Sequence, residues 1–182
     1  MKKWMTLLMM VLVIGLLAAC GGEDKDTSKE PETDTEADAT EADATTGATQ
    51  VIVQGEDDLL SGVSKDGAWI IIFEDDFSTD NELVLTGEFE SKGEPARKLA
   101  LYTQDEDRNI IDQFTLTAPK LTVQSENTRI QGGTFAGDVY VEANGFSIPD
   151  GTIDGNLYFA SEEYQDSADL TGGEVTGSVE VQ

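Results

Sequence analysis

A segment of twelve residues that occurs three times near the C-terminus constrains the fold more than any other feature. The copies are 130–141, 148–159 and 170–181, so the first two start 18 residues apart and a short insertion lengthens the interval before the third. Two glycine columns and four apolar columns keep their register in all three copies. Apolar residues alternate near the end of each copy, as at Val139 and Val141, which is the period of a β-strand. A unit this short cannot bury its own apolar face, and therefore the copies must stack on one another.

This pattern predicts an all-β fold, a single-stranded parallel β-helix (β-solenoid) with coils of about 18 residues and of either hand. Such a coil divides into three sides of about six residues, and stacking places equivalent residues about 4.8 Å apart. The alternative is an antiparallel meander with Gly-rich hairpins. The spacings lack a two-residue hairpin signature and disfavour that alternative.

The predicted interior consists of the apolar columns of the repeat. They are Ile130, Phe135, Val139, Val141, Ile148, Ile153, Leu157, Phe159, Leu170, Val175, Val179 and Val181. The glycine columns, which include Gly137 and Gly155, are expected at corners that need a positive φ or a tight bend.

The register of the repeat also extends toward the N-terminus. Leu121 and Val123 lie 18 residues before Val139 and Val141. The pairs 99/101 and 83/85 are interpreted as degraded coils further back, which makes about seven coils in all. Residues 59–63 are expected to form a short helix or an irregular cap.

The C-terminal end of the repeat region carries no residues that could cover it. Residues 179–182 end the chain in the middle of a predicted strand, which leaves the last coil open. Val179 and Val181 are therefore the candidate residues for self-association, through stacking of coils into a homo-oligomer.

The N-terminal region has the pattern of a bacterial lipoprotein. Two lysines precede an apolar run that continues to Ala19, which is the length of a signal-peptide core and too short for a membrane span. Leu17-Ala18-Ala19-Cys20 resembles a lipobox, in which the peptidase cuts before a cysteine that carries diacylglycerol. This resemblance implies a signal peptide over 1–19, lipid attachment at Cys20, and anchoring of the protein to the extracytoplasmic face of the bacterial cell membrane.

Residues 20–50 are expected to be a disordered acidic linker, and residues 51–182 the β-helix domain. Between residues 21 and 50 there are ten acidic residues against two lysines, and almost nothing apolar beyond alanine. Such a composition cannot bury enough surface to offset the chain entropy.

The charge and the residue content exclude several function classes. The domain has 27 acidic residues against seven basic ones, a net charge of −20. This makes nucleic acid an unsuitable partner. The chain contains no histidine, and its one cysteine is assigned to the lipid, so the usual nucleophile–base pairs are missing. We predict no catalytic residue, no cofactor and no metal site, and interpret the acidic clusters at 74–76 and 105–107 as solvated turns.

The sequences Gly137-Asp138-Val139-Tyr140-Val141 and Gly155-Asn156-Leu157-Tyr158-Phe159, on a coil of about 18 residues, resemble the bactofilins, which are polymer-forming bacterial proteins. The resemblance covers residues 116–182. It implies a three-sided β-helix that assembles end to end through its terminal coils without nucleotide.

Together these features predict a non-enzymatic cell-surface lipoprotein with a structural or scaffolding role. The alternative is a carbohydrate-binding or carbohydrate-acting β-helix of the cell envelope with a cell-wall polysaccharide as partner. In that case the outward pair Tyr140 and Tyr158 would contact the sugar.

Overall fold

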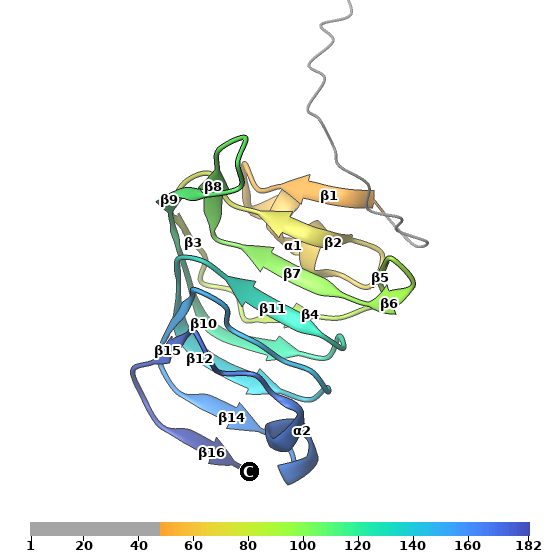
Figure 1. Cartoon of the computed structure of the whole chain (residues 1–182), viewed down its shortest axis with the longest axis vertical. Helices are drawn as coiled ribbons and strands as arrows, with labels where there is room; N and C mark the ends of the chain where they lie inside the picture. The colour runs from red at the N-terminus through yellow and green to blue at the C-terminus, as the bar shows by residue number, and fades with distance from the viewer. Residues whose placement is uncertain (1–47) are drawn as a thin grey trace, which may run out of the picture. The chain divides into compact units, whose positions relative to one another are not determined.

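The computed structural model describes residues 48–182 (Figure 1). The predicted signal peptide, the lipid attachment at Cys20 and most of the acidic linker lie outside the described residues. Within residues 48–182 there are two short helices, α1 (Glu56–Val63) and α2 (Glu162–Ser167), and sixteen strands. The strands are β1 (Ala48–Ile52), β2 (Ala68–Ile72), β3 (Phe77–Ser78), β4 (Leu83–Leu85), β5 (Glu90–Ser91), β6 (Glu94–Pro95), β7 (Arg97–Ala100), β8 (Tyr102–Gln104), β9 (Ile110–Gln113), β10 (Thr115–Val123), β11 (Thr128–Gln131), β12 (Thr134–Val141), β13 (Thr152–Asp154), β14 (Leu157–Phe159), β15 (Glu174–Val175) and β16 (Val179–Val181).

The fold is all-β and is built around two parallel sheets. Sheet A contains β1, β2, β7 and β11 in that order. Sheet B contains β3, β10, β12, β13 and β15, with β4, β14 and β16 alongside them. Among the named strands of the described region, antiparallel pairing occurs at the hairpins β5–β6 and β8–β9 alone. The parallel sense of both sheets shows that the antiparallel meander is wrong.

The three copies of the repeat are neighbours in sheet B, in the register that the sequence predicts. Phe135 pairs with Ile153, which pairs with Val175. Val139 pairs with Leu157, which pairs with Val179. Equivalent residues of successive copies therefore lie directly beside one another across parallel strands.

A continuous column of apolar residues runs through sheet B. Leu83, Leu121, Val139, Leu157 and Val179 follow one another on five adjacent strands. The first four members of the column are at most 1% exposed. Removing a side chain of this size from water stabilises the fold by about 1.5–3 kcal/mol.

The interpretation of residues 99/101 as a separate coil between 83/85 and 121/123 is wrong. Leu99 belongs to sheet A, where it pairs with Ile71 and Ile130. Leu83 pairs directly with Leu121 although the two are 38 residues apart. The hairpins β5–β6 and β8–β9 take up many of the intervening residues. The column therefore has fewer members than the seven coils expected.

The predicted interior is confirmed for eight of its twelve residues. Ile130, Phe135, Val139, Val141, Ile148, Ile153, Leu157 and Phe159 are all 0% exposed. Leu170 and Val175 are partly buried against the same core. Val179 and Val181 are 40% and 39% exposed, since no further strand of the described region covers them.

The glycines of the repeat columns are required mainly because the backbones of neighbouring repeat copies approach each other closely. Gly137 has a positive φ of 149°, as the corner interpretation expects, but Gly155 and Gly177 do not have a positive φ. A Cβ atom at Gly155 would overlap the carbonyl oxygen of Gly137, and one at Gly177 would overlap the carbonyl oxygen of Gly155. The expectation of a positive φ is therefore wrong for these two positions, whereas the requirement for glycine stands.

Helix α1 packs at the end of the core that contains β1, β2 and β4, and confirms the short helix expected at 59–63. Its residues Leu59 and Val63 belong to the main apolar cluster. The buried Arg97 donates from Nη2 to the carbonyl oxygens of Gly62 and Ser64 at 2.8 and 3.0 Å. A cation at this point stabilises the C-terminal end of the helix.

Candidate functional site

The C-terminal end of the domain exposes apolar residues that belong to the interior columns. We use the name end surface for Leu170, Val175, Val179 and Val181. Val179 and Val181 lie beside the fully buried Leu157 and Phe159, so they are the last members of their columns. The structure thus places the two residues predicted for self-association next to each other, about two-fifths exposed.

Strand β16 also has an unpaired edge among the described strands, because its one partner is β14. An unpaired edge together with exposed apolar side chains favours the addition of another strand. In Figure 1, β16 lies at the opposite end of the domain from β1 and α1. One end of the core is therefore covered by a helix, and the other is open.

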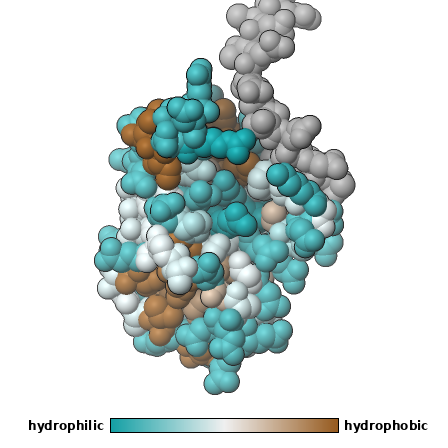
Figure 2. Space-filling model, in the orientation of Figure 1, coloured by the Kyte–Doolittle hydropathy of each residue, from teal (hydrophilic) through white to brown (hydrophobic). Residues whose placement is uncertain are grey.

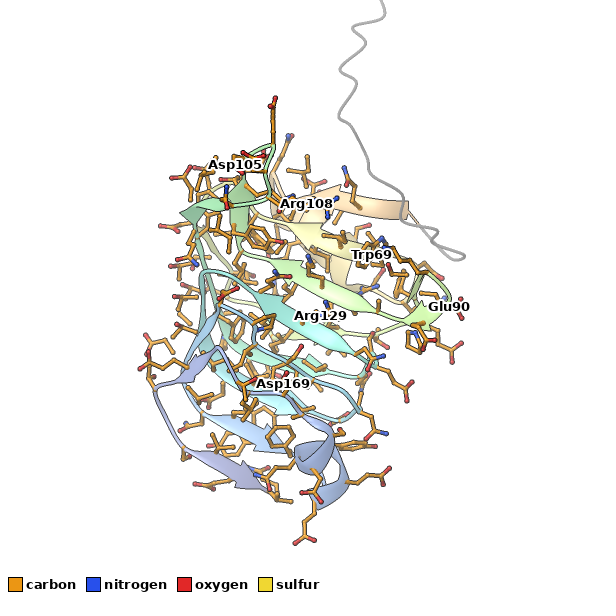
Figure 3. The ribbon with its side chains drawn as sticks, in the orientation of Figure 1. Trp69, Glu90, Asp105, Arg108, Arg129 and Asp169 are labelled. Atoms are coloured by element: carbon orange, nitrogen blue, oxygen red, sulfur yellow. The ribbon has the colours of Figure 1, made fainter. Side chains whose placement is uncertain are left out.

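A second candidate site is a groove on the outer face of sheet A, with a volume of about 860 Å³. Its floor includes Trp69 of β2, Lys98 of β7 and Arg129 of β11, and the β5–β6 hairpin contributes Ser91, Lys92 and Glu94. Trp69, Arg129 and Asp169 follow one another down this face in Figure 3. Figure 2 shows that hydrophilic residues predominate over the middle of this face.

The groove holds an unusual share of the positive charge of the domain. The seven basic residues of the domain are Lys65, Lys92, Arg97, Lys98, Arg108, Lys120 and Arg129. Lys92, Lys98 and Arg129 line the groove, and so does Arg97, which is 1% exposed and directs its guanidinium toward the end of α1; two acidic residues, Glu94 and Asp169, line it as well.

The cations of the groove differ in their surroundings. Burial lowers the pKa of Arg97 to about 10, which leaves the group charged at neutral pH. Its guanidinium lies 3.8 Å from the centre of the Phe89 ring. Lys98 Nζ donates to the Tyr102 hydroxyl at 3.2 Å. The ion pairs Lys65–Asp66 and Lys120–Glu82 involve lysines outside the groove.

The groove could not be predicted from the sequence, because the hairpin insertions determine which strands of sheet A lie side by side. Lys98 pairs with Arg129 across β7 and β11, although the β8–β9 hairpin and β10 lie between them along the chain. The sequence signal that could have found the groove is the clustering of Lys92, Arg97 and Lys98 in an otherwise acidic domain.

Tyr140 and Tyr158, the residues of the carbohydrate alternative, pack against each other on neighbouring strands. Their ring centres are 4.7 Å apart. Lys120 Nζ lies 5.6 Å from the centre of the Tyr140 ring and comes from β10, on the other side of β12 from Tyr158. Burial, followed by the nearby charge of Asp138, raises the pKa of Tyr158. This arrangement accounts for the pair as cross-strand packing.

The cluster at 105–107 forms a local turn, whereas Asp76 of the cluster at 74–76 contacts the start of the distant strand β10. Asp105 accepts hydrogen bonds from the side chain and the backbone N–H of Asn109, which lower its pKa. Asp76 accepts from the backbone N–H of Thr115 at 2.7 Å. Within residues 48–182, no three acidic, His or Cys side chains are grouped so that they could hold a metal ion.

Comparison with known proteins adds no family to these observations. No protein-family model matches the chain, and no curated protein and no solved structure matches it either. The structure defines the class of the domain as all-β with two parallel sheets. Among the described residues, no helix has the length and apolar character that crossing a membrane requires.

Proposed function

We propose that this chain is a non-enzymatic, lipid-anchored surface protein that self-associates through the end surface. The observation that carries the proposal is the exposure of Val179 and Val181 at the end of two otherwise buried apolar columns. Burying them against a second copy removes apolar surface from water.

We further propose that sheets A and B are the sides of a bactofilin-like parallel β-helix. The support is the repeated order in which the chain visits them. It passes from β11 in sheet A to the two halves of β12 in sheet B. In the next copy it passes from Ser147, which forms a parallel bridge with Arg129, to β13 and β14. In the last copy it passes from Asp169, which forms a parallel bridge with Ser147, to β15 and β16. The register shift between Thr117 and Lys120 is where we expect sheet B to turn from one proposed side to the next.

The covered end restricts how many copies can join. Strand β1 also has one unpaired edge among the described strands, but α1 covers the apolar core at that end, so the open apolar ends of two copies are the surfaces that match. Joining them uses the same patch on both copies, which gives a closed pair with two-fold symmetry rather than a growing stack. A single pair is therefore the expected assembly.

Charge opposes this association and makes it dependent on salt. Each domain carries a net charge of −20, and Glu174 and Glu180 lie on the strands of the open end. The screening length is about 30 Å at 0.01 M salt and about 3 Å at 1 M. We expect monomers in dilute buffer and pairs in molar salt.

The test is light scattering of the full chain in detergent across a salt series, compared with Val179→Lys. The variant places a cation in the apolar contact and should stay monomeric at every salt concentration. Val84→Lys is the matched control, because Val84 is 43% exposed on β4, away from the end surface. A wild-type protein that is monomeric throughout, or pairing that survives Val179→Lys, would contradict the proposal.

The membrane anchor is a separate part of the proposal and rests on the lipobox. Cys20→Ala removes the thiol that carries the lipid, so the protein should be released from membranes or remain an uncleaved precursor. Two acyl chains hold a protein stably on a bilayer, whereas one holds it marginally. Membrane fractionation with mass analysis checks this, and a variant of mature size that remains wholly in the membrane fraction would refute the anchor.

A further inference from the structure

The pairing of Lys98 with Arg129 is unfavourable unless something else neutralises it. The two residues are directly opposite each other on adjacent parallel strands, where neighbouring positions are about 4.8 Å apart. Like charges in this position repel and destabilise a sheet. The ion pairs Lys65–Asp66 and Lys120–Glu82 use other lysines, and two acidic residues, Glu94 and Asp169, line the groove beside these cations.

The rest of the groove extends this positive region and supplies polar partners. Lys92 lies in the turn of the β5–β6 hairpin and has a positive φ of 57°, which few non-glycine residues adopt. This strained turn places Lys92 among the groove residues, together with the amide of Asn127 and the hydroxyls of Ser147 and Thr171. The groove thus combines cations with groups that donate and accept hydrogen bonds.

We propose that the groove binds an acidic oligosaccharide, whose carboxylate or phosphate groups pair with Lys98 and Arg129. A volume of about 860 Å³ lies in the range of roughly 300–1,000 Å³ that is usual for small-ligand sites. Charge-assisted hydrogen bonds from lysine and arginine to such anions are short and strong. Sugar hydroxyls match the Ser147 hydroxyl and the amide of Asn127, which also donates to the Pro95 carbonyl oxygen, and they can donate to the Asp169 carboxylate, which also accepts from the Thr171 hydroxyl.

An acidic peptide fits the groove less well than a sugar does. Extended peptides bind sheets by adding a strand to an unpaired edge. The groove lies over the face of sheet A, where β7 is already paired on both sides with β2 and β11. Recognition must therefore come from side chains, which suits a ligand that carries many hydroxyl groups and a few charges.

The experiment uses the full chain in non-ionic detergent, with Trp4→Phe so that Trp69 is the one indole that remains. The probes are tetragalacturonate, a phosphorylated tetrasaccharide, neutral cellotetraose and a short poly-glutamate peptide. Binding is followed by the fluorescence of Trp69 and by calorimetry. The two acidic sugars distinguish a carboxylate from a phosphate source of the charge.

Saturable binding of at least one acidic sugar is expected, with an affinity that falls as salt rises. Lys98→Gln and Arg129→Gln should each raise the dissociation constant about tenfold or more, because each removes a charged hydrogen bond. Lys65→Gln is the matched control, since Lys65 is an exposed lysine outside the groove, and it should leave the dissociation constant unchanged.

Three results would overturn the proposal. One is the absence of saturable binding by both acidic sugars. Another is binding of cellotetraose as tight as that of the acidic sugars, with no effect of either variant. The third is tighter binding of poly-glutamate that is lost in the same variants, which would assign the groove to an acidic peptide instead.

Discussion

Single glycines allow the backbones of neighbouring repeat copies to approach each other closely. Gly155 lies between Gly137 and Gly177, and a methyl group at Gly155 would overlap the backbone of the adjacent turn. Backbone atoms cannot move aside as a flexible side chain can. Overpacking of this kind usually costs about 1–3 kcal/mol.

We therefore expect Gly155→Ala to lower the free energy of unfolding by about 2 kcal/mol. Glu163→Ala is the control, because Glu163 is exposed on α2, a helix with no buried residue. It should change the free energy by less than about 0.5 kcal/mol. Urea denaturation followed by circular dichroism measures both, and equal small effects would refute the close-stacking explanation.

The strands of the repeat, and β10 directly before it, could be predicted from the sequence, whereas the strands further toward the N-terminus could not be placed correctly. The register of β12, β14 and β16 follows from the repeat, because glycine and apolar columns coincide. Leu99 was misplaced because its intervals from Leu83 and from Leu121 each resemble the length of one coil. The structure shows one interval of 38 residues that contains two hairpins. A hairpin insertion leaves no periodic signal, so the groove that depends on Lys98 and Arg129 was missed as well.

The edge strand β16 should be less protected than the central strand β12 of sheet B. β16 is paired on one side by β14, whereas β12 is paired on both sides. In dilute buffer we expect amide hydrogen exchange to be fast in β16 and slow in β12, because opening an edge breaks fewer contacts. In molar salt the exchange of β16 should slow, while that of the β5–β6 hairpin should not change. Mass-spectrometric exchange measures this, and equal slowing of both elements would point to a general effect of salt.

The domain as a whole has two unlike ends and one cationic face. The end with β1 and α1 is covered, and the end with β16 is open. In the proposed pair, the two β1 strands lie at the two far ends of the assembly, and the cationic face of sheet A remains outside the contact. The surfaces assigned to association and to sugar binding are therefore separate, and variants of one should leave the other intact.

The in-register stack also limits how far apart in the chain two contacting residues can be. In the apolar column the longest interval, 38 residues, separates Leu83 from Leu121. The later members follow one another at much shorter intervals, and adding further copies of the repeat would not lengthen these intervals. The entropy lost on closing a loop grows with the logarithm of its length, so the 38-residue interval costs about 0.7 kcal/mol more to close than an 18-residue one. The sequence separation of contacting residues consequently stays small along the repeat, and within this column it is largest where Leu83 meets Leu121.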